Sequence, residues 1–139
     1  MEKAILDTDT VSEILKGKNP RVIDRAEEYL TIHGQFSFSD FTRFEITRGL
    51  KAKGAITQLA RFDGFCENCA VLPVRPEILD LASDLWAQAR INGLPAGDAD
   101  LIIAATALFN RMILVTGNSP HFRWIPRLTT LDWRSGPMS

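Results

Sequence analysis

The sequence predicts an α/β protein, a three-layer α/β/α sandwich around a short, mainly parallel, twisted sheet. Short apolar runs suited to buried strands alternate along the chain with longer segments of helical periodicity. Strands separated by helices pair in parallel and carry helices on both faces of the sheet. The 139 residues, 45% of them hydrophobic, suffice for one packed core and not for two, so we expect a single domain over residues 1–139.

The first segments already alternate strand and helix. Residues 4–6 are predicted to form a short buried strand, and residues 10–16 a short helix that Gly17 ends. A second helix is expected over residues 20–30, because proline is well tolerated in a first helical turn, where its missing N–H has no partner to lose.

The middle of the chain repeats this alternation. Residues 35–37 are the second predicted strand, and Ser39 or Asp40 caps a helix that continues to Leu50, because short oxygen-bearing side chains satisfy free N–H groups at a helix start. Apolar residues at helical spacing predict another helix over residues 56–65.

The second half supplies the remaining elements. We predict a strand over residues 70–74, an amphipathic helix over residues 76–89, and a helix over residues 101–109 that is apolar nearly all round and therefore buried. An uninterrupted apolar run predicts a buried strand at residues 112–115, and a last short strand lies at residues 129–131.

The N-terminus shows no signal peptide and no membrane-spanning run, because Glu2 and Lys3 are followed only by Ala4 to Leu6 before Asp7. We therefore expect a cytosolic protein without a membrane partner.

Cys66 and Cys69 form a CxxC pair that we interpret as two semi-buried thiols at a helix end. A zinc site needs two further ligands, and His33 and His121 are both distant in sequence without a partner at ligand spacing. A redox pair needs a thiolate at a helix N-terminus, whereas these cysteines follow a helix and precede a strand.

Three acids in apolar frames, Asp7, Glu45 and Asp100, predict one metal site. In an open parallel sheet the residues after the strands, and the helix ends at the same edge, converge on the ligand. Converging carboxylates repel each other unless a cation lies between them. An all-oxygen ligand set suits Mg²⁺, with Mn²⁺ as an alternative ion, and such an ion activates water for phosphodiester hydrolysis.

Asp98 and Asp100 differ by about 200° around a helix, so both cannot face one ion. We choose Asp100 as the ligand and interpret Asp98 as an N-cap, with a supporting role as the alternative. Asp9 is interpreted as a residue that stabilises a turn.

The chain resembles the PIN-domain ribonucleases, and among them the VapC-type toxins of toxin–antitoxin pairs. The resemblance rests on ILDTD at residues 5–9, FEITRGL at 44–50, DLIIAATAL at 100–108, LVTGNSPHF at 114–122 and RLTTLDW at 127–133, in that order over nearly the whole chain. Each segment alone is weak evidence, and five in order are strong evidence.

The resemblance implies a Mg²⁺-dependent endoribonuclease in which Asp7, Glu45 and Asp100 hold the metal and Thr116 and Asn118 support them. Many members of the family carry a fourth acid where this chain has Asn118, which puts a second metal ion in doubt. An asparagine amide binds a water or a phosphate but contributes no charge.

The resemblance also implies an RNA substrate, a small antitoxin and a homodimer. The net charge of −1 does not indicate nucleic-acid binding, but Arg43 and Arg48 flank Glu45 and are candidate contacts to RNA phosphates, or else a solvated helix face. Four aromatic residues crowd one segment and suit either an interface or the core: Phe36, Phe38, Phe41 and Phe44.

Two other functions stay open at this point. The chain could be a degenerate PIN module that binds a partner or RNA without catalysis, since fold does not imply function. Asp7, Asp9 and Val11 also fit the DxDx[TV] signature of haloacid-dehalogenase-like phosphatases, in which Asp7 would be the nucleophile.

Overall fold

A parallel sheet forms the centre of the computed structural model, which describes residues 1–94 and 96–135. Within that range the sheet has five strands in the order β3-β2-β1-β4-β5, and every neighbouring pair is parallel. The strands are short: β1 Ala4–Leu6, β2 Ser37–Ser39, β3 Ala70–Leu72, β4 Ile113–Val115 and β5 Thr130–Leu131. The α/β class and the parallel sheet are confirmed.

Helices connect the strands, as parallel pairing requires. They are α1 Thr8–Lys16, α2 Pro20–His33, α3 Asp40–Ala52, α4 Ile56–Glu67, α5 Pro76–Ile91 and α6 Asp98–Phe109, followed by the short 3₁₀ helix η1 Ser119–His121. None of these helices combines the length and apolar character needed to cross a membrane.

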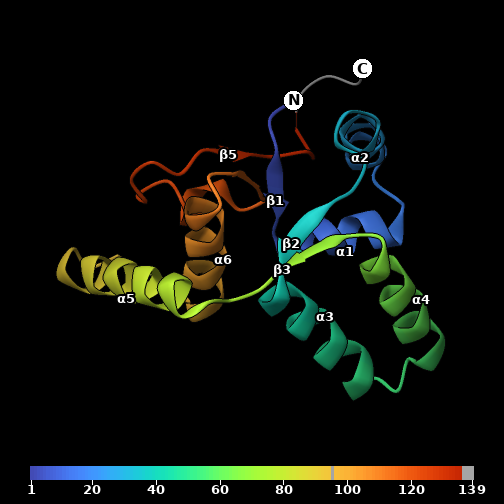
Figure 1. Ribbon diagram of the computed structural model, residues 1–139, viewed down its shortest axis with the longest axis horizontal. Helices are drawn as coiled ribbons and strands as arrows, with labels where there is room; N and C mark the ends of the chain where they lie inside the picture. Colours follow the sequence, from blue (N-terminus) through green and yellow to red (C-terminus); the bar gives the residue numbers. More distant parts are fainter. Residues whose placement is uncertain (95, 136–139) are drawn as a thin grey trace.

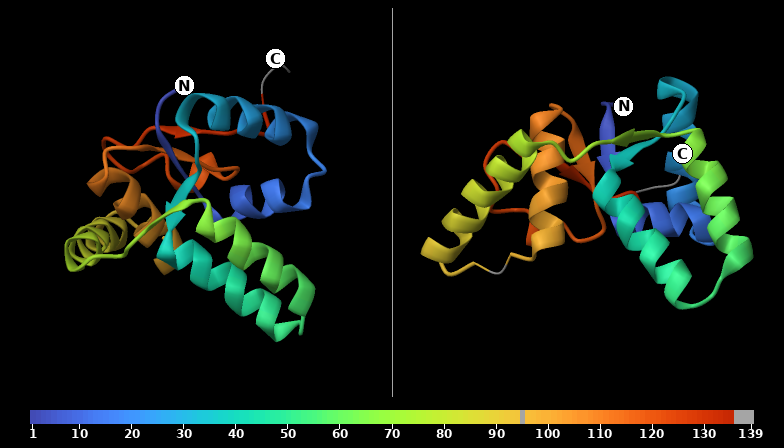
Figure 2. Two further views of the ribbon diagram at one scale, coloured as in Figure 1. Left: turned by 45° about the vertical axis from the view of Figure 1, so that its right-hand side comes forward. Right: turned by 60° about the horizontal axis from the view of Figure 1, so that its bottom comes forward.

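Two apolar layers hold the helices to the two faces of the sheet. One layer contains buried residues of α1, α2 and α4, among them Val11, Tyr29 and Phe62. The other contains buried residues of α5 and α6, among them Leu85 and Ala104. Figure 1 shows α5 and α6 on one side of the strands and α1, α2 and α4 on the other, and the turned views of Figure 2 keep this separation.

The second strand begins two residues later than predicted. The prediction of residues 35–37 is wrong, because β2 is Ser37–Ser39 and Phe36 lies before it. Ser37 and Ser39 are both buried together with Phe38. A strand that is buried on both faces has no exposed polar side. The alternation of apolar and polar residues at this place therefore does not mark where the strand begins or ends.

The predicted helix ends are partly confirmed. Gly17 ends α1 in the left-handed conformation, and the Ser39 hydroxyl accepts a hydrogen bond from the Phe41 N–H at the start of α3. Asp98 is not an N-cap, because Gly97 holds that position without a side-chain bond. Asp9 does not stabilise a turn, because it lies in the first turn of α1, where its charge suits the helix dipole.

The aromatic cluster is divided between core and surface. Phe36 and Phe38 are buried, whereas the Phe44 side chain is 52% exposed and lies under the Arg48 guanidinium, 4.9 Å from the ring centre. Cys66 is buried and Cys69 half-buried, both as free thiols. Burial raises the pKa of Cys69 to about 11, so this thiol is not a reactive thiolate at neutral pH.

Candidate active site

The carboxyl edge of the sheet brings together the ends of its central strands. Leu6 pairs with Val115 on one side and with Phe38 on the other, so Asp7 leaves β1 beside Thr116, the first residue after β4. The Asp7 N–H donates to the Val115 carbonyl at 3.0 Å, which continues the ladder one residue beyond the strands. In Figure 1, β1 and β2 point toward this common edge, where α3 begins.

Asp7 is a buried carboxyl group that also caps α1. Its Oδ1 accepts a hydrogen bond from the Thr10 N–H at 2.8 Å. Burial raises the pKa of Asp7 above its ordinary value of 3.8, while hydrogen bonds from Thr116 and Thr10 oppose that rise. Among the described residues no Lys, Arg or His pairs with this carboxylate. The charged form is therefore disfavoured by desolvation, which a bound cation would offset.

We expect Asp7→Asn to stabilise the protein at neutral pH when no metal is present. The pKa of Asp7 is raised on folding, so the free energy of unfolding falls as the pH rises from about 4 through the raised value. Asparagine removes this ionisation and still caps a helix. Melting curves from about pH 3 to pH 8 in chelator should show no difference at the acid end and a higher melting temperature for the variant at pH 7.

The matched control is Asp9→Asn, which changes an exposed acid two residues away in the same helix. Its melting temperature should not follow the same pH dependence. A lower melting temperature for Asp7→Asn at pH 7 would show that the Asp7 carboxylate stabilises the fold, contrary to the direction of its pKa.

Glu45 lies on the second turn of α3 and is held by threonine hydroxyls. The Thr8 Oγ1 donates to Glu45 Oε1 at 2.6 Å, and the Thr8 and Thr42 oxygens are 3.1 Å apart. Since the single Thr8 hydrogen goes to Glu45, Thr42 must donate to Thr8. Arg48 Nη2 approaches the other Glu45 oxygen at 3.8 Å. Thr8 follows Asp7 directly, so the network joins Glu45 to the end of β1.

Asp100 faces the segment that follows β4. His121 Nδ1 lies 3.4 Å from Asp100 Oδ2 and 2.7 Å from Asn118 Nδ2. One ring nitrogen cannot accept from Asn118 and donate to Asp100 at once, so it serves one partner at a time. The Asn118 N–H donates to Thr116 Oγ1 at 3.0 Å, which ties this group to the residue beside Asp7.

The predicted ligands share one edge but do not form one cluster. In residues 1–94 and 96–135, no three Asp, Glu, His or Cys side chains lie close enough to hold one metal ion. Asp7 turns to Thr10 and Thr116, Glu45 to Thr8, and Asp100 to His121. Asp98 lies in the first turn of α6, after the N-cap residue Gly97. The metal-binding role of the three acids stays a prediction.

Beside Glu45 lies a groove of about 510 Å³ between α1, α3 and α4. Apolar side chains form much of its wall, among them Leu15, Ile46 and Phe62. Lys16 and Arg61 also line it, while Arg43 is exposed on α3 and is not among its lining residues. An extended segment lying in this groove would reach Thr8 and Glu45, and so the edge that carries Asp7.

Two contributors were not predicted from the sequence. Thr8 was not singled out because a hydroxyl beside an acid is a common sequence feature, and its distance to Glu45 depends on how α1 and α3 pack. His121 was considered only as a zinc ligand and rejected. Its position three residues after Asn118, in a 3₁₀ turn, was the available signal, because such a turn folds the ring back toward Asn118.

A protein-family profile described as PIN domain matches residues 4–125, which is most of the chain. The chain belongs to the PIN-domain family. Two relatives named "tRNA(fMet)-specific endonuclease VapC" match this PIN domain, one from Shigella flexneri at 28% identity and one from Salmonella typhimurium at 27%. Each match covers 96% of this chain and 99% of the relative. The resemblance in the five sequence segments is thus confirmed.

Solved structures show the same fold. The PIN domain superposes on a chain of DNA-bound VapBC from Salmonella typhimurium with a TM-score of 0.83 at 27% identity, covering 96% of this chain and 99% of that one. VapBC2 from Rickettsia felis, bound to a fragment of its promoter, gives a TM-score of 0.82 at 21% identity, with 94% and 98% covered. The three-layer PIN-like fold is therefore confirmed.

Proposed function

We propose that this PIN domain is a Mg²⁺-dependent endoribonuclease and the toxin of a toxin–antitoxin pair. The observation that carries the proposal is the buried carboxyl group of Asp7 at the edge where Asp100, Asn118 and Glu45 also lie. The names of the full-length relatives support the same activity and direct the choice of substrate toward transfer RNA, with initiator tRNA as the first to test.

The donor atoms at this edge suit a hard divalent cation. Asp7, Glu45 and Asp100 offer carboxylate oxygens and Asn118 an amide oxygen, and Mg²⁺ and Mn²⁺ prefer such ligands. Burial of Asp7 without a cationic partner among the described residues leaves a charge for the ion to offset. When bound, the ion supplies Lewis-acid activation of water and neutralises charge on the phosphate.

The chain's own side chains prepare the site in three ways. Thr10 and Thr116 fix the carboxyl group of Asp7, and Thr8 fixes that of Glu45. Asn118 replaces the fourth acid common in the family, so we propose one metal ion. Arg43 and Arg48 lie before and after Glu45 in the sequence of α3, and we propose that they contact RNA phosphates, for which the arginine fork is well suited.

Cleavage of a radiolabelled initiator tRNA tests the activity. We expect cleavage in Mg²⁺, none in EDTA, and a 5′-phosphate on the downstream product. Hydrolysis of p-nitrophenyl phosphate without RNA cleavage would instead favour the haloacid-dehalogenase-like alternative. RNA binding in Mg²⁺ without cleavage of any RNA would favour a degenerate binding module.

For the antitoxin, we propose that an inhibitory segment lies in the groove between α1, α3 and α4 and places an arginine against Glu45 and Asp7. Arginine matches a carboxylate with two parallel hydrogen bonds. Leu15 lies on the wall of the groove and is exposed in the free protein. We expect Leu15→Glu to weaken antitoxin binding by about tenfold, because the bound segment would bury the new charge. Calorimetry measures the affinity. Cleavage without antitoxin should not change.

Leu79→Glu is the control, because Leu79 is as exposed as Leu15 (46% and 41%) but lies on α5, away from the groove. Equal antitoxin binding by wild type and Leu15→Glu would place the antitoxin elsewhere.

We also propose a homodimer, for which the exposed Phe44 and Ile91 offer apolar contact area. Sedimentation equilibrium measures it directly.

A further inference from the structure

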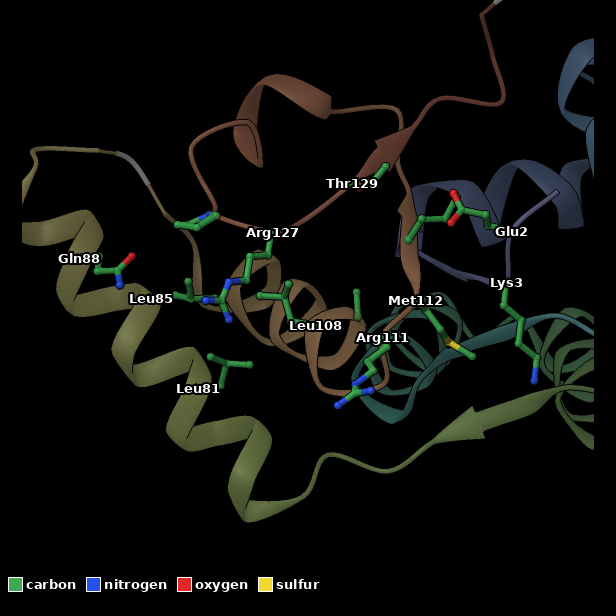
Figure 3. A pocket seen from close by; sticks show the side chains of 13 residues that line it. Glu2, Lys3, Leu81, Leu85, Gln88, Leu108, Arg111, Met112, Arg127 and Thr129 are labelled. Atoms are coloured by element: carbon green, nitrogen blue, oxygen red, sulfur yellow. The ribbon is translucent and has the colours of Figure 1, made fainter.

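A hollow of about 870 Å³ lies at the end of the sheet opposite the candidate active site. Lys3 precedes β1, Arg111 lies just before β4, and Thr129 precedes β5, so the hollow opens at the amino ends of these strands. Figure 3 shows Arg111 and Arg127 reaching into the space between α5 and the end of α6, with Leu81 and Leu85 of α5 facing them.

Both arginines have a backbone conformation that favours glycine. Among the described non-glycine residues only Arg111 and Arg127 have positive φ, at 56° and 68°. Arg111 follows α6 in a Schellman motif, because its N–H donates to the Leu108 carbonyl at 3.2 Å and the Met112 N–H to the Ala107 carbonyl at 3.0 Å. Glycine is the usual residue at this position.

Arg127 occupies a similar position in a turn. The Leu128 N–H lies 3.5 Å from the Ile125 carbonyl, with Pro126 second and Arg127 third in the turn. Proline followed by a residue of positive φ is the pattern of a type II turn, whose third position favours glycine or asparagine. At both positions the chain carries an arginine where the backbone would be less strained with glycine.

An interaction of the two arginine side chains is therefore expected to compensate for the backbone strain. A positive charge at the end of α6 is favourable for the helix dipole, which accounts for a cation at Arg111 but not at Arg127. Within the described residues neither guanidinium makes an ion pair or a hydrogen bond. Two guanidinium groups from different loops thus line one hollow without a partner in the described part of the chain.

The other walls define what the hollow can hold. Lys3 adds a third positive charge, and Glu2 is the one carboxylate among the described lining residues. Leu81, Leu85 and Met112 supply an aliphatic surface, and no aromatic side chain lines the described part of the hollow for stacking a base. The volume falls within the range of small-molecule sites.

We propose that this hollow binds a small organic anion, with a phosphate or carboxylate group at Arg111 and Arg127 and an aliphatic body against Leu81, Leu85 and Met112. Guanidinium groups hold such anions with paired hydrogen bonds, and the aliphatic wall gains free energy when it covers an apolar chain. The site is separate from the RNA-cleaving edge and does not depend on the proposed nuclease function.

Titration calorimetry with n-octyl phosphate, below its micellar concentration, tests both parts of the ligand. We expect octyl phosphate to bind at least about tenfold more tightly than inorganic phosphate, because burial of a few methylene groups supplies more than a factor of ten. Octanol, which has no charge, should not bind measurably. Equal affinity for octyl phosphate and inorganic phosphate would overturn the amphipathic class of ligand.

The decisive variant is Arg111→Gly/Arg127→Gly, which removes both guanidinium groups and relieves both backbones. We expect the affinity for octyl phosphate to fall about tenfold or more while the melting temperature stays the same or rises. The control Arg75→Ala/Arg123→Ala removes the same charge from exposed positions outside the hollow and should bind like wild type.

Unchanged affinity of the glycine variant for octyl phosphate would show that the arginines do not meet the ligand, and this result overturns the proposal. Vesicles of phosphatidylglycerol distinguish the source of the anion. Vesicle binding by wild type that is lost in the glycine variant points to a lipid headgroup. If wild type binds octyl phosphate but not the vesicles, the ligand is a free metabolite. Neither measurement uses RNA or metal, so both stand if nuclease activity fails.

Discussion

Asp7→Asn and Asp100→Asn are expected to lower RNA cleavage by on the order of a thousandfold or more, because metal stabilisation of the transition state is worth several kcal/mol and each 1.4 kcal/mol or so is tenfold in rate. An asparagine in place of Asp7 would still cap α1, and Asp100 is 38% exposed, so both variants should fold. Initial rates on the same tRNA, with circular dichroism as the folding check, measure the effect.

Asp98→Asn is the matched control for Asp100→Asn. Asp98 lies in the same first turn of α6 but is not its N-cap, so its loss should change the rate little. A wild-type rate for Asp7→Asn would rule out Asp7 as a metal ligand. An equal loss for Asp98→Asn and Asp100→Asn would mean that the charge of this helix end matters rather than one coordinating oxygen.

Mg²⁺ is expected to raise the melting temperature by roughly 8 to 11 °C at about 100 times its dissociation constant. Binding to the native state alone contributes about 2.7 kcal/mol at that concentration, and a domain of this size shifts by roughly 3 to 4 °C per kcal/mol. The physical reason is the desolvated carboxyl group of Asp7, whose charged form the cation stabilises. Scanning calorimetry in chelator and in Mg²⁺, at matched ionic strength, measures the shift.

Asp100→Asn should reduce this Mg²⁺-induced shift, whereas Asp9→Asn should leave it unchanged. No shift in wild-type protein would contradict a metal site at this edge. A full shift in Asp100→Asn together with lost cleavage would place the metal on other ligands and give Asp100 a different role in the reaction.

The sequence predicted which elements exist more accurately than where they begin. The helix from Pro76 was found because its apolar residues recur at helical spacing and a proline marks its start. The strand Ser37–Ser39 was displaced because its buried serines look polar in sequence. Their burial depends on neighbours from other elements, which no local pattern contains.

The same limit applies to the site. Asp7, Glu45 and Asp100 could be placed at one edge from the carboxyl ends of the predicted strands and the direction of the helices alone. Their hydrogen-bond partners could not, because Thr8 meets Glu45 only through the packing of α1 against α3, and His121 meets Asp100 only through the turn after β4. Side-chain rotation decides whether carboxylates at a shared edge also point to a shared ion.

The central place of β1 in the sheet has a consequence for synthesis of the protein. Ala4 is made 109 residues before its partner Ile113 (113 − 4 = 109), and Asn118 follows later still. At about 5 to 20 residues per second this interval lasts on the order of ten seconds. The nascent chain holds Asp7 and Glu45 but lacks the strand that completes their edge. The proposed active-site edge is therefore complete only after translation has passed Asn118.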